Sequence, residues 1–141
     1  MKDITEVLNE KTLGVLRSIG SHYNLQRFKD LNKEGLVNKI EMFMKSDQFQ
    51  EEIKQRLTIP MIRFLNLLMK ADNKCENYSQ LEKSFPETRR TPNLFHDTHY
   101  KLSIEGLIYD LTDEQGRQVI CIPKEFVPWL EEFGQKQISE L

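Results

Sequence analysis

Hydrophobic residues recur every three or four positions through the first 58 residues, with polar residues between them. This period is that of an α-helix with one buried face. It predicts helices over residues 4–8, 13–19, 33–44 and 45–58. Asp3, Thr12 and Asp47 stand where a side chain can cap the first turn of a helix. Gly20 and Ser21 predict the end of the second helix.

The second half of the chain predicts three helices, a β-hairpin and a closing helix, in that order. The three helices are expected over residues 60–70, 79–85 and 92–104. The first of them is apolar on nearly all sides and is expected at the centre of a core, and residues 73–77 are expected to form a connector after it. Apolar residues across 106–111 and 118–122 flank a turn that contains Gly116, which is typical of two antiparallel strands. The closing helix is expected to begin near Lys124.

A short pattern runs through the predicted helices near the amino end. Residues 13–20, 24–25 and 31–40 carry a Leu-Arg pair in the first helix, a turn, and a Lys-x-x-Leu-Val opening of the second. This pattern resembles the helix-extended-helix module at the amino end of the Rho transcription terminator and, more distantly, SAP domains. In those families the module handles nucleic acid or serves as an adaptor beside a nucleic-acid-binding domain, so the resemblance implies one of these roles.

The order of elements over residues 59–133 is also distinctive. A helix, a connector, a helix, a turn and a helix ending in Leu-x-x-x-Gly-Leu-Ile-Tyr precede the two strands. This order resembles a winged helix-turn-helix domain. It implies an α+β fold, mostly α, in which a small helical module (1–46) and a connecting helix (47–58) precede a winged helix (59–141) with a two-stranded wing. Winged helices include DNA-binding and protein-docking modules, so both functions stay open.

Composition and charge limit the classes of protein to which the chain can belong. The chain has 141 residues, of which 38% are hydrophobic and 30% charged, and its net charge is −2. These values are typical of a globular protein with no need of metal or disulfides, and the charge excludes a strongly basic nucleic-acid coat. Residues 1–46 carry 8 basic against 6 acidic side chains, whereas residues 85–122 carry 4 against 6. Positive charge therefore leans towards the amino end.

No segment predicts a membrane span or a secretory signal. The most apolar stretch, residues 59–69, contains Arg63 and Asn66, and it is far shorter than the ~20 residues that span a bilayer. No uninterrupted apolar run follows the first residues. Cys75 and Cys121 lie in unrelated contexts without the spacing of a metal site, which is typical of a reducing compartment. We therefore expect a cytoplasmic protein with no membrane partner.

The predicted helix over residues 92–104 is the candidate recognition helix. The positions off its apolar stripe would face a partner: Asn93, His96, Asp97, Tyr100 and Lys101. Arg89 and Arg90 precede the helix, where a phosphate would meet free backbone N–H groups and two guanidinium groups. Arg117 would reach a nucleic-acid backbone from the wing. Asp113 and Glu114 oppose DNA binding, and the alternative is a solvated helix on a protein-docking module.

Basic residues of the amino-terminal module offer a second candidate surface. Four of them could form one face for phosphate contacts: Arg17, Lys29, Lys33 and Lys39. Tyr23 beside His22 would add an aromatic ring on which a base could stack. The alternative is that the lysines only solubilise a helix exterior.

No set of residues predicts catalysis, a cofactor or a metal. His96 and His99 lie three positions apart, but no third ligand matches them, and His99 is expected as a satisfied core residue. The chain contains no nucleophile elbow, phosphate loop or zinc-binding histidine pair. The sequence predicts a non-enzymatic nucleic-acid-binding protein, with DNA favoured over RNA and a role in transcription regulation. A protein partner docked on the winged helix is the alternative, and the oligomeric state stays open.

Overall fold

The chain divides into two compact units in the computed structural model, which describes residues 1–86 and 90–140, the last four by their backbone only. The first unit comprises Lys2–Arg56 and the second Leu57–Leu141. The helix that was expected to connect the two halves, α4 (Asp47–Arg56), belongs to the first unit.

The amino-terminal unit is helical. Its elements before α4 are α1 (Ile4–Asn9), α2 (Leu13–His22), the 3-10 turn η1 (Phe28–Asp30) and α3 (Lys33–Met44). Asp3 and Thr12 cap α1 and α2 as predicted, because their side chains accept the backbone N–H groups of Glu6 and Val15. The cap of α4 is Ser46 rather than Asp47, since the Ser46 hydroxyl accepts the Phe49 N–H at 3.3 Å.

The predicted end of α2 at Gly20 is wrong, because the helix continues through Gly20 to His22. Gly20 is buried, and a Cβ built on it would lie 2.9 Å from the Cβ and Cγ of Phe28. The missing side chain therefore lets η1 pack directly on α2. This glycine serves close packing rather than helix termination.

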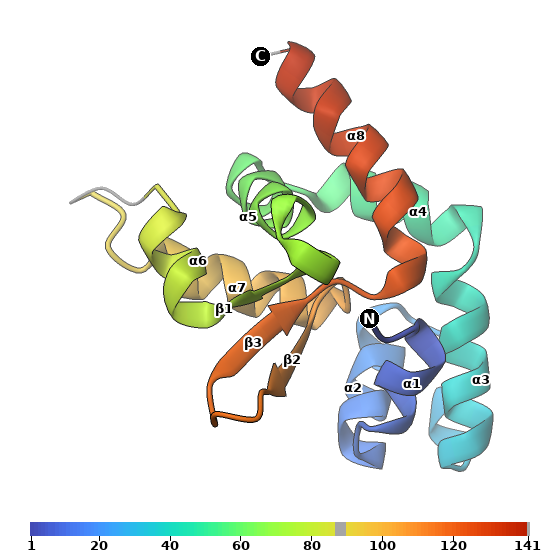
Figure 1. Ribbon diagram of the computed structural model, residues 1–141. Coiled ribbons are helices and arrows are strands. Elements are labelled where there is room, and N and C mark those ends of the chain that lie inside the picture. Colours follow the sequence, from blue (N-terminus) through green and yellow to red (C-terminus); the bar gives the residue numbers. More distant parts are fainter. Residues whose placement is uncertain (87–89, 141) are drawn as a thin grey trace. The chain divides into compact units, whose positions relative to one another are not determined.

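The carboxy-terminal unit is a winged helix. Its elements are α5 (Ile59–Lys70), η2 (Asp72–Lys74), β1 (Cys75–Asn77), α6 (Tyr78–Ser84), α7 (Leu94–Glu105), β2 (Tyr109–Thr112), β3 (Gln118–Cys121), η3 (Lys124–Phe126) and α8 (Val127–Glu140). The strands form one antiparallel sheet in the order β1-β3-β2, and β2 and β3 project from it as a hairpin (Figure 1). The predicted α+β fold class, mostly helical, is confirmed.

Three boundaries in this unit differ from the predictions. Strand β1 lies where a connector was expected, so the sheet has three strands and not only the two of the hairpin. Helix α6 begins at Tyr78 because the Asn77 carboxamide accepts the N–H groups of Ser79 and Gln80. Strand β2 begins at Tyr109 rather than at Gly106, whose φ of 81° ends α7.

The core of this unit centres on α5, as its apolar sequence predicts. Phe64 has no exposed surface, and its ring stacks on that of Phe95 in α7 with centroids 5.3 Å apart. Leu65 and Leu68 are buried on the same helix. None of the described helices is both long enough and apolar enough to cross a bilayer.

Candidate nucleic-acid interface

Helix α7 has one buried and one exposed face, as its period predicts. The buried side chains are Phe95, Thr98, Leu102 and Glu105. All five side chains that were expected to face a partner are exposed: Asn93, His96, Asp97, Tyr100 and Lys101. Tyr100 is 66% exposed. The exposed face therefore offers amide, imidazole, phenol and ammonium groups, with one carboxylate among them.

His99 fixes the base of the hairpin to α7. Its side chain is half-buried, and its Nε2 lies 3.1 Å from Oδ1 of Asp110 on β2. The Gln118 amide on β3 donates to Oδ2 of the same carboxylate at 2.9 Å. The ring of His99 also packs edge-on against Tyr78 with centroids 5.4 Å apart. His99 is thus a partly buried residue with a polar partner, and it joins α7, α6 and both strands of the wing.

His96 is held by helix α6 although it faces solvent. Its Nδ1 lies 2.5 Å from the Tyr78 hydroxyl, and its Nε2 lies 3.7 Å from a carboxylate oxygen of Glu82. The side chain is still 60% exposed. These contacts orient the imidazole from α6, a feature that the sequence did not reveal because Tyr78 and His96 are 18 positions apart.

The turn of the wing is built around Asp113. Its carboxylate accepts the backbone N–H groups of Gln115 and Arg117, both at 2.9 Å, and the Arg117 Nε at 2.8 Å. The Arg117 backbone N–H, followed by the guanidinium and the Gln115 N–H, holds the pKa of Asp113 below that of an ordinary aspartate. Gly116, with a φ of 78°, permits the left-handed backbone that the turn requires.

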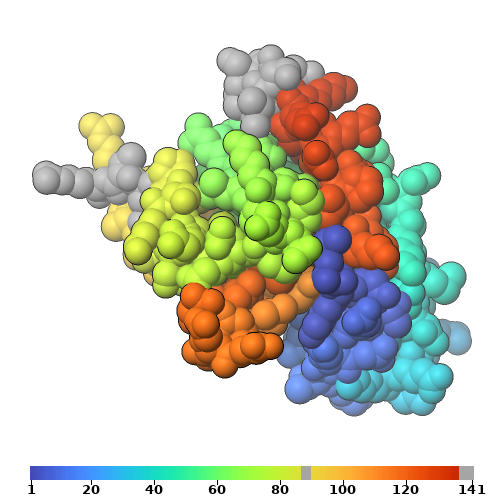
Figure 2. All heavy atoms as spheres, viewed as in Figure 1, coloured from blue at the N-terminus to red at the C-terminus, as the bar shows by residue number. Residues whose placement is uncertain are grey.

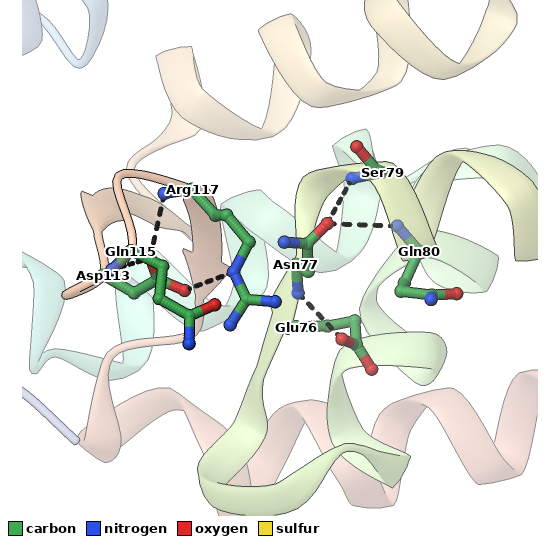
Figure 3. A network of polar contacts seen from close by, with 7 residues as sticks. All are labelled: Glu76, Asn77, Ser79, Gln80, Asp113, Gln115 and Arg117. Atoms are coloured by element: carbon green, nitrogen blue, oxygen red, sulfur yellow. Dashed lines mark hydrogen bonds and ion pairs between the residues drawn. The ribbon is translucent and has the colours of Figure 1, made fainter.

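Arg117 presents its side chain beside the junction of β1 and α6. Figure 3 shows its guanidinium directed from the wing turn towards this junction, where Glu76 and Asn77 lie. The arginine side chain is 58% exposed although it is paired with Asp113. A phosphate could therefore still approach the guanidinium from solvent.

A groove of about 590 Å³, lined by both polar and apolar surface, separates the wing turn from the start of α6. Its walls come from β1, the first turn of α6, the wing turn and β3: Cys75, Glu76, Asn77, Tyr78, Ser79, Gln80, Asp113, Arg117, Gln118 and Val119. In Figure 2 the orange hairpin and the yellow-green start of α6 lie side by side on the surface. Two carboxylates and one guanidinium line the groove, which therefore has no positive excess.

Cys75 and Cys121 form a disulfide, so the expectation of two unrelated cysteines typical of a reducing compartment is wrong. The two residues lie opposite each other in the antiparallel pair of β1 and β3, with Cα atoms 4.2 Å apart. The bond joins positions separated by 46 residues. Connectivity of this kind depends on the pairing of distant strands, and β1 is too short to show an alternating pattern.

The four basic candidates of the amino-terminal unit lie on three successive elements. Arg17 on α2 and Lys29 on η1 are exposed, whereas Lys39 on α3 is half-buried. Lys33 donates its ammonium to the Asn9 carbonyl at 2.9 Å, so one of its three donors is committed to the fold. The Lys29 ammonium lies 5.8 Å from the centre of the Phe28 ring.

The expected stacking role of Tyr23 is wrong. Tyr23 is only 7% exposed, and its ring packs against Phe43 and Phe49. The guanidinium of Arg56 lies over it at 5.3 Å from the ring centre and also contacts His22. The aromatic ring that was expected to receive a base is therefore part of the core.

The region before α7 is described only in part. Arg89 lies outside the described residues, whereas Arg90 and Asn93 are exposed ahead of the helix. Among the described residues, no group of three or more histidine, cysteine, aspartate or glutamate side chains could hold a metal ion. The groups that can meet a ligand here are hydrogen-bonding and charged side chains.

Comparison with known proteins finds little. No protein-family model matches the chain, and no curated relative is found. Among solved structures, the chain is similar to MepR, a transcription regulator of the Staphylococcus aureus multidrug efflux pump MepA, with 20% identity, a TM-score of 0.47, and coverage of 79% of this chain and 85% of that one. A likeness at this level carries no conclusion about what this chain binds.

Proposed function

We propose that the carboxy-terminal unit binds duplex DNA through α7 and the hairpin β2–β3, and that the protein regulates transcription without catalysing a reaction. The observation that carries the proposal is the exposed face of α7, on which His96, Tyr100 and Lys101 stand beside a wing that presents Arg117. A helix with such a face fits the major groove of DNA, where its polar side chains can reach base edges.

The geometry favours DNA over RNA. The major groove of B-form DNA admits an α-helix, whereas the deep and narrow major groove of A-form RNA does not. The sequence-reading element of this unit is a helix, and its described aromatic rings that are largely exposed on α7 are those of His96 and Tyr100. A duplex is therefore the better match than a single strand that needs several stacking rings.

The charge of this surface limits its affinity. Asp97 is exposed on α7, and the Asp113 carboxylate accepts a hydrogen bond from the guanidinium of Arg117. We propose that phosphate contacts come from Arg89, Arg90, Lys101 and Arg117, and that Asn93, His96 and Tyr100 contribute to sequence preference. Few contacts of this type predict modest affinity with a clear salt dependence.

We propose that the amino-terminal unit adds contacts without sequence preference. Its candidates are Arg17, Lys29, Lys33 and Lys39, in keeping with the resemblance of this unit to the Rho amino-terminal and SAP-like modules. Arg17 and Lys29 are exposed, so either can meet a phosphate without loss of a core contact. As a DNA-binding protein the chain would act in the cytoplasm.

A salt titration tests the proposal. The affinity for a labelled duplex should fall linearly on a log-log plot against salt concentration, and Lys101→Ala should reduce the slope by about 1, as one lost phosphate contact requires. His96→Ala or Tyr100→Ala should instead change the preference among sequences. The control is Lys136→Ala on α8, which removes the same charge outside the proposed interface.

Two results would contradict the proposal. One is a dissociation constant weaker than about 10⁻⁴ M for every duplex at low salt, which is the weak end of nonspecific binding. The other is an equal effect of Lys101→Ala and Lys136→Ala on the salt slope. The first result would favour the alternative of a protein-docking module, for which a search for protein partners is the next experiment.

A further inference from the structure

The disulfide between Cys75 and Cys121 joins strands β1 and β3 of the winged helix. Strand β1, which carries Cys75, leads directly into α6, and strand β3, which carries Cys121, is one side of the wing. The Ile122 N–H donates to the Lys74 carbonyl, so the cysteine pair stands next to a backbone hydrogen bond of the same strand pair. The bond therefore ties the wing to the start of α6.

A disulfide is unusual in a protein that works on DNA inside a cell. Glutathione and thioredoxin keep thiols reduced there, and the disulfides that form are usually transient, either catalytic or redox-sensing. The structure holds no second cysteine pair that could act with this one, because the chain contains only two cysteines. Any exchange of this bond therefore uses thiols from outside the protein.

The surroundings of the bond allow attack from one side. Cys121 has no exposed surface. Cys75 is half-buried and forms part of the wall of the groove between the wing turn and the start of α6. Its volume of about 590 Å³ is within the range of small-molecule binding sites, which suits a small peptide-like thiol. Cys75 is therefore the more exposed half of the bond, which makes its sulfur the expected point of attack by a thiolate and Cys121 the leaving group.

We propose that Cys75–Cys121 is a reversible thiol–disulfide exchange site for low-molecular-weight thiols, and that opening it weakens DNA binding. The second part rests on the function proposed above. A thiolate RS⁻ attacks the Cys75 sulfur, the bond to Cys121 breaks, and the Cys121 thiolate takes a proton from water. A second thiol then attacks the sulfur of R and releases RSSR and the Cys75 thiol. Two thiols are oxidised, and one protein disulfide is reduced to two thiols.

The consequence for the wing follows from the length of β1. This strand has three residues and, among the described strands, pairs only with β3, so the disulfide is a large part of what fixes it to the wing. Without the disulfide, the start of α6 and the wing move more freely relative to each other. A duplex that contacts α7 and the wing together must then order them on binding. The conformational entropy lost in this ordering lowers the affinity of the protein for the duplex.

The test uses the full chain in its oxidised and reduced forms. Reduced glutathione should give a mixed disulfide at Cys75, identified by peptide mass, and excess dithiothreitol should give two alkylatable thiols. Hydrogen exchange should rise in residues 75–77 and 118–121 after reduction. The affinity for a duplex should fall about fivefold or more, which is the range of ordinary coupling between sites, and oxidised glutathione should restore it.

Cys75→Ala provides the matched control, because it removes the half-buried cysteine of the bond and leaves the fully buried Cys121 in place. This variant should bind DNA as the reduced protein does and should not respond to thiols. Cys75→Ser serves if the alanine variant does not fold.

The outcomes separate the two proposals. Mixed disulfide at Cys121 instead of Cys75, or a bond that resists excess thiol in the folded protein, would overturn the exchange site. Equal duplex affinity of the fully oxidised and fully reduced protein would overturn its control of binding. Failure of both forms to bind any duplex would overturn the proposed function and the control of binding with it, while a mixed disulfide at Cys75 would still support the exchange site.

Discussion

Single residues of helix α2 show how packing decides what a glycine does. Gly14 and Gly20 lie on the same helix, but their surroundings differ. A Cβ on Gly14 would meet only the Thr12 hydroxyl, at 4.0 Å, whereas a Cβ on Gly20 would lie 2.9 Å from two atoms of Phe28. The helix alone would gain from alanine at either position, since glycine costs about 1 kcal/mol relative to alanine in a helix interior.

We therefore predict opposite effects of the same substitution. Gly14→Ala should raise the free energy of unfolding by about 0.5–1 kcal/mol. Gly20→Ala should lower it by about 1 kcal/mol or more, because η1 must move away from α2. Urea unfolding followed by circular dichroism measures both. A gain in stability from Gly20→Ala would show that Phe28 does not pack on this helix.

The wing turn should depend on pH through Asp113. The carboxylate pKa is lowered in the folded chain by the N–H and guanidinium groups that it accepts, the Arg117 N–H first. Its stabilising effect is therefore complete above the ordinary aspartate pKa of about 4 and is lost as the pH falls through the lower folded value. Hydrogen exchange or NMR shifts of the Gln115 and Arg117 amides should show the turn loosening in that acid range.

Asp113→Asn should abolish this pH dependence, because the carboxamide keeps an acceptor oxygen but cannot titrate. Glu114→Gln removes a neighbouring carboxylate of the same turn that does not accept these N–H groups. This variant should keep the pH transition. A transition that persists in Asp113→Asn would assign it to another group.

At the scale of elements, the apolar helix α5 carries the core of the winged helix. Leu65→Ala should lower the free energy of unfolding by about 2–5 kcal/mol, since the side chain is only 3% exposed and its loss leaves a cavity. Leu67→Ala, at a half-buried position of the same helix, should cost clearly less. Equal costs in urea unfolding would contradict the position of α5 at the centre of this core.

Elements with strong local signals were predictable from the sequence. The period of apolar residues and the capping side chains of Asp3 and Thr12 locate α1 and α2 because both signals act within one helical turn. Strand β1 was missed because three residues show no alternation. Its pairing with β3, and the disulfide between them, depend on contacts between segments 46 positions apart.

The exposed helix face of the candidate site was also predictable from the sequence, whereas the tertiary contacts of its side chains were not. The exposed face of α7 follows from its period, so Tyr100 and Lys101 are exposed as expected. The contact of His96 with Tyr78 and the burial of Tyr23 depend on how distant elements pack, and no local pattern reveals them. The local period of apolar residues thus predicts which face of α7 is exposed. The packing of distant elements decides which side chains of the candidate site remain accessible to a ligand.

At the scale of the whole molecule, the proposed function makes the winged helix the DNA-binding unit. The chain carries a net charge of −2, so its binding must depend on where its cations lie rather than on their excess. The exposed face of α7 and the wing turn are the surfaces that such binding must use. The amino-terminal unit would add to the affinity through Arg17 and Lys29.

The most direct measurement is an NMR titration of the full isotope-labelled chain with a short duplex. If α7 and the wing bind DNA, the largest amide shift changes should fall in residues 93–104, which cover Asn93 and most of α7, and in residues 113–118 of the wing. The changes in α8 should be close to zero. Spectra that do not change, or changes confined to elements other than α7 and the hairpin, would contradict this proposal.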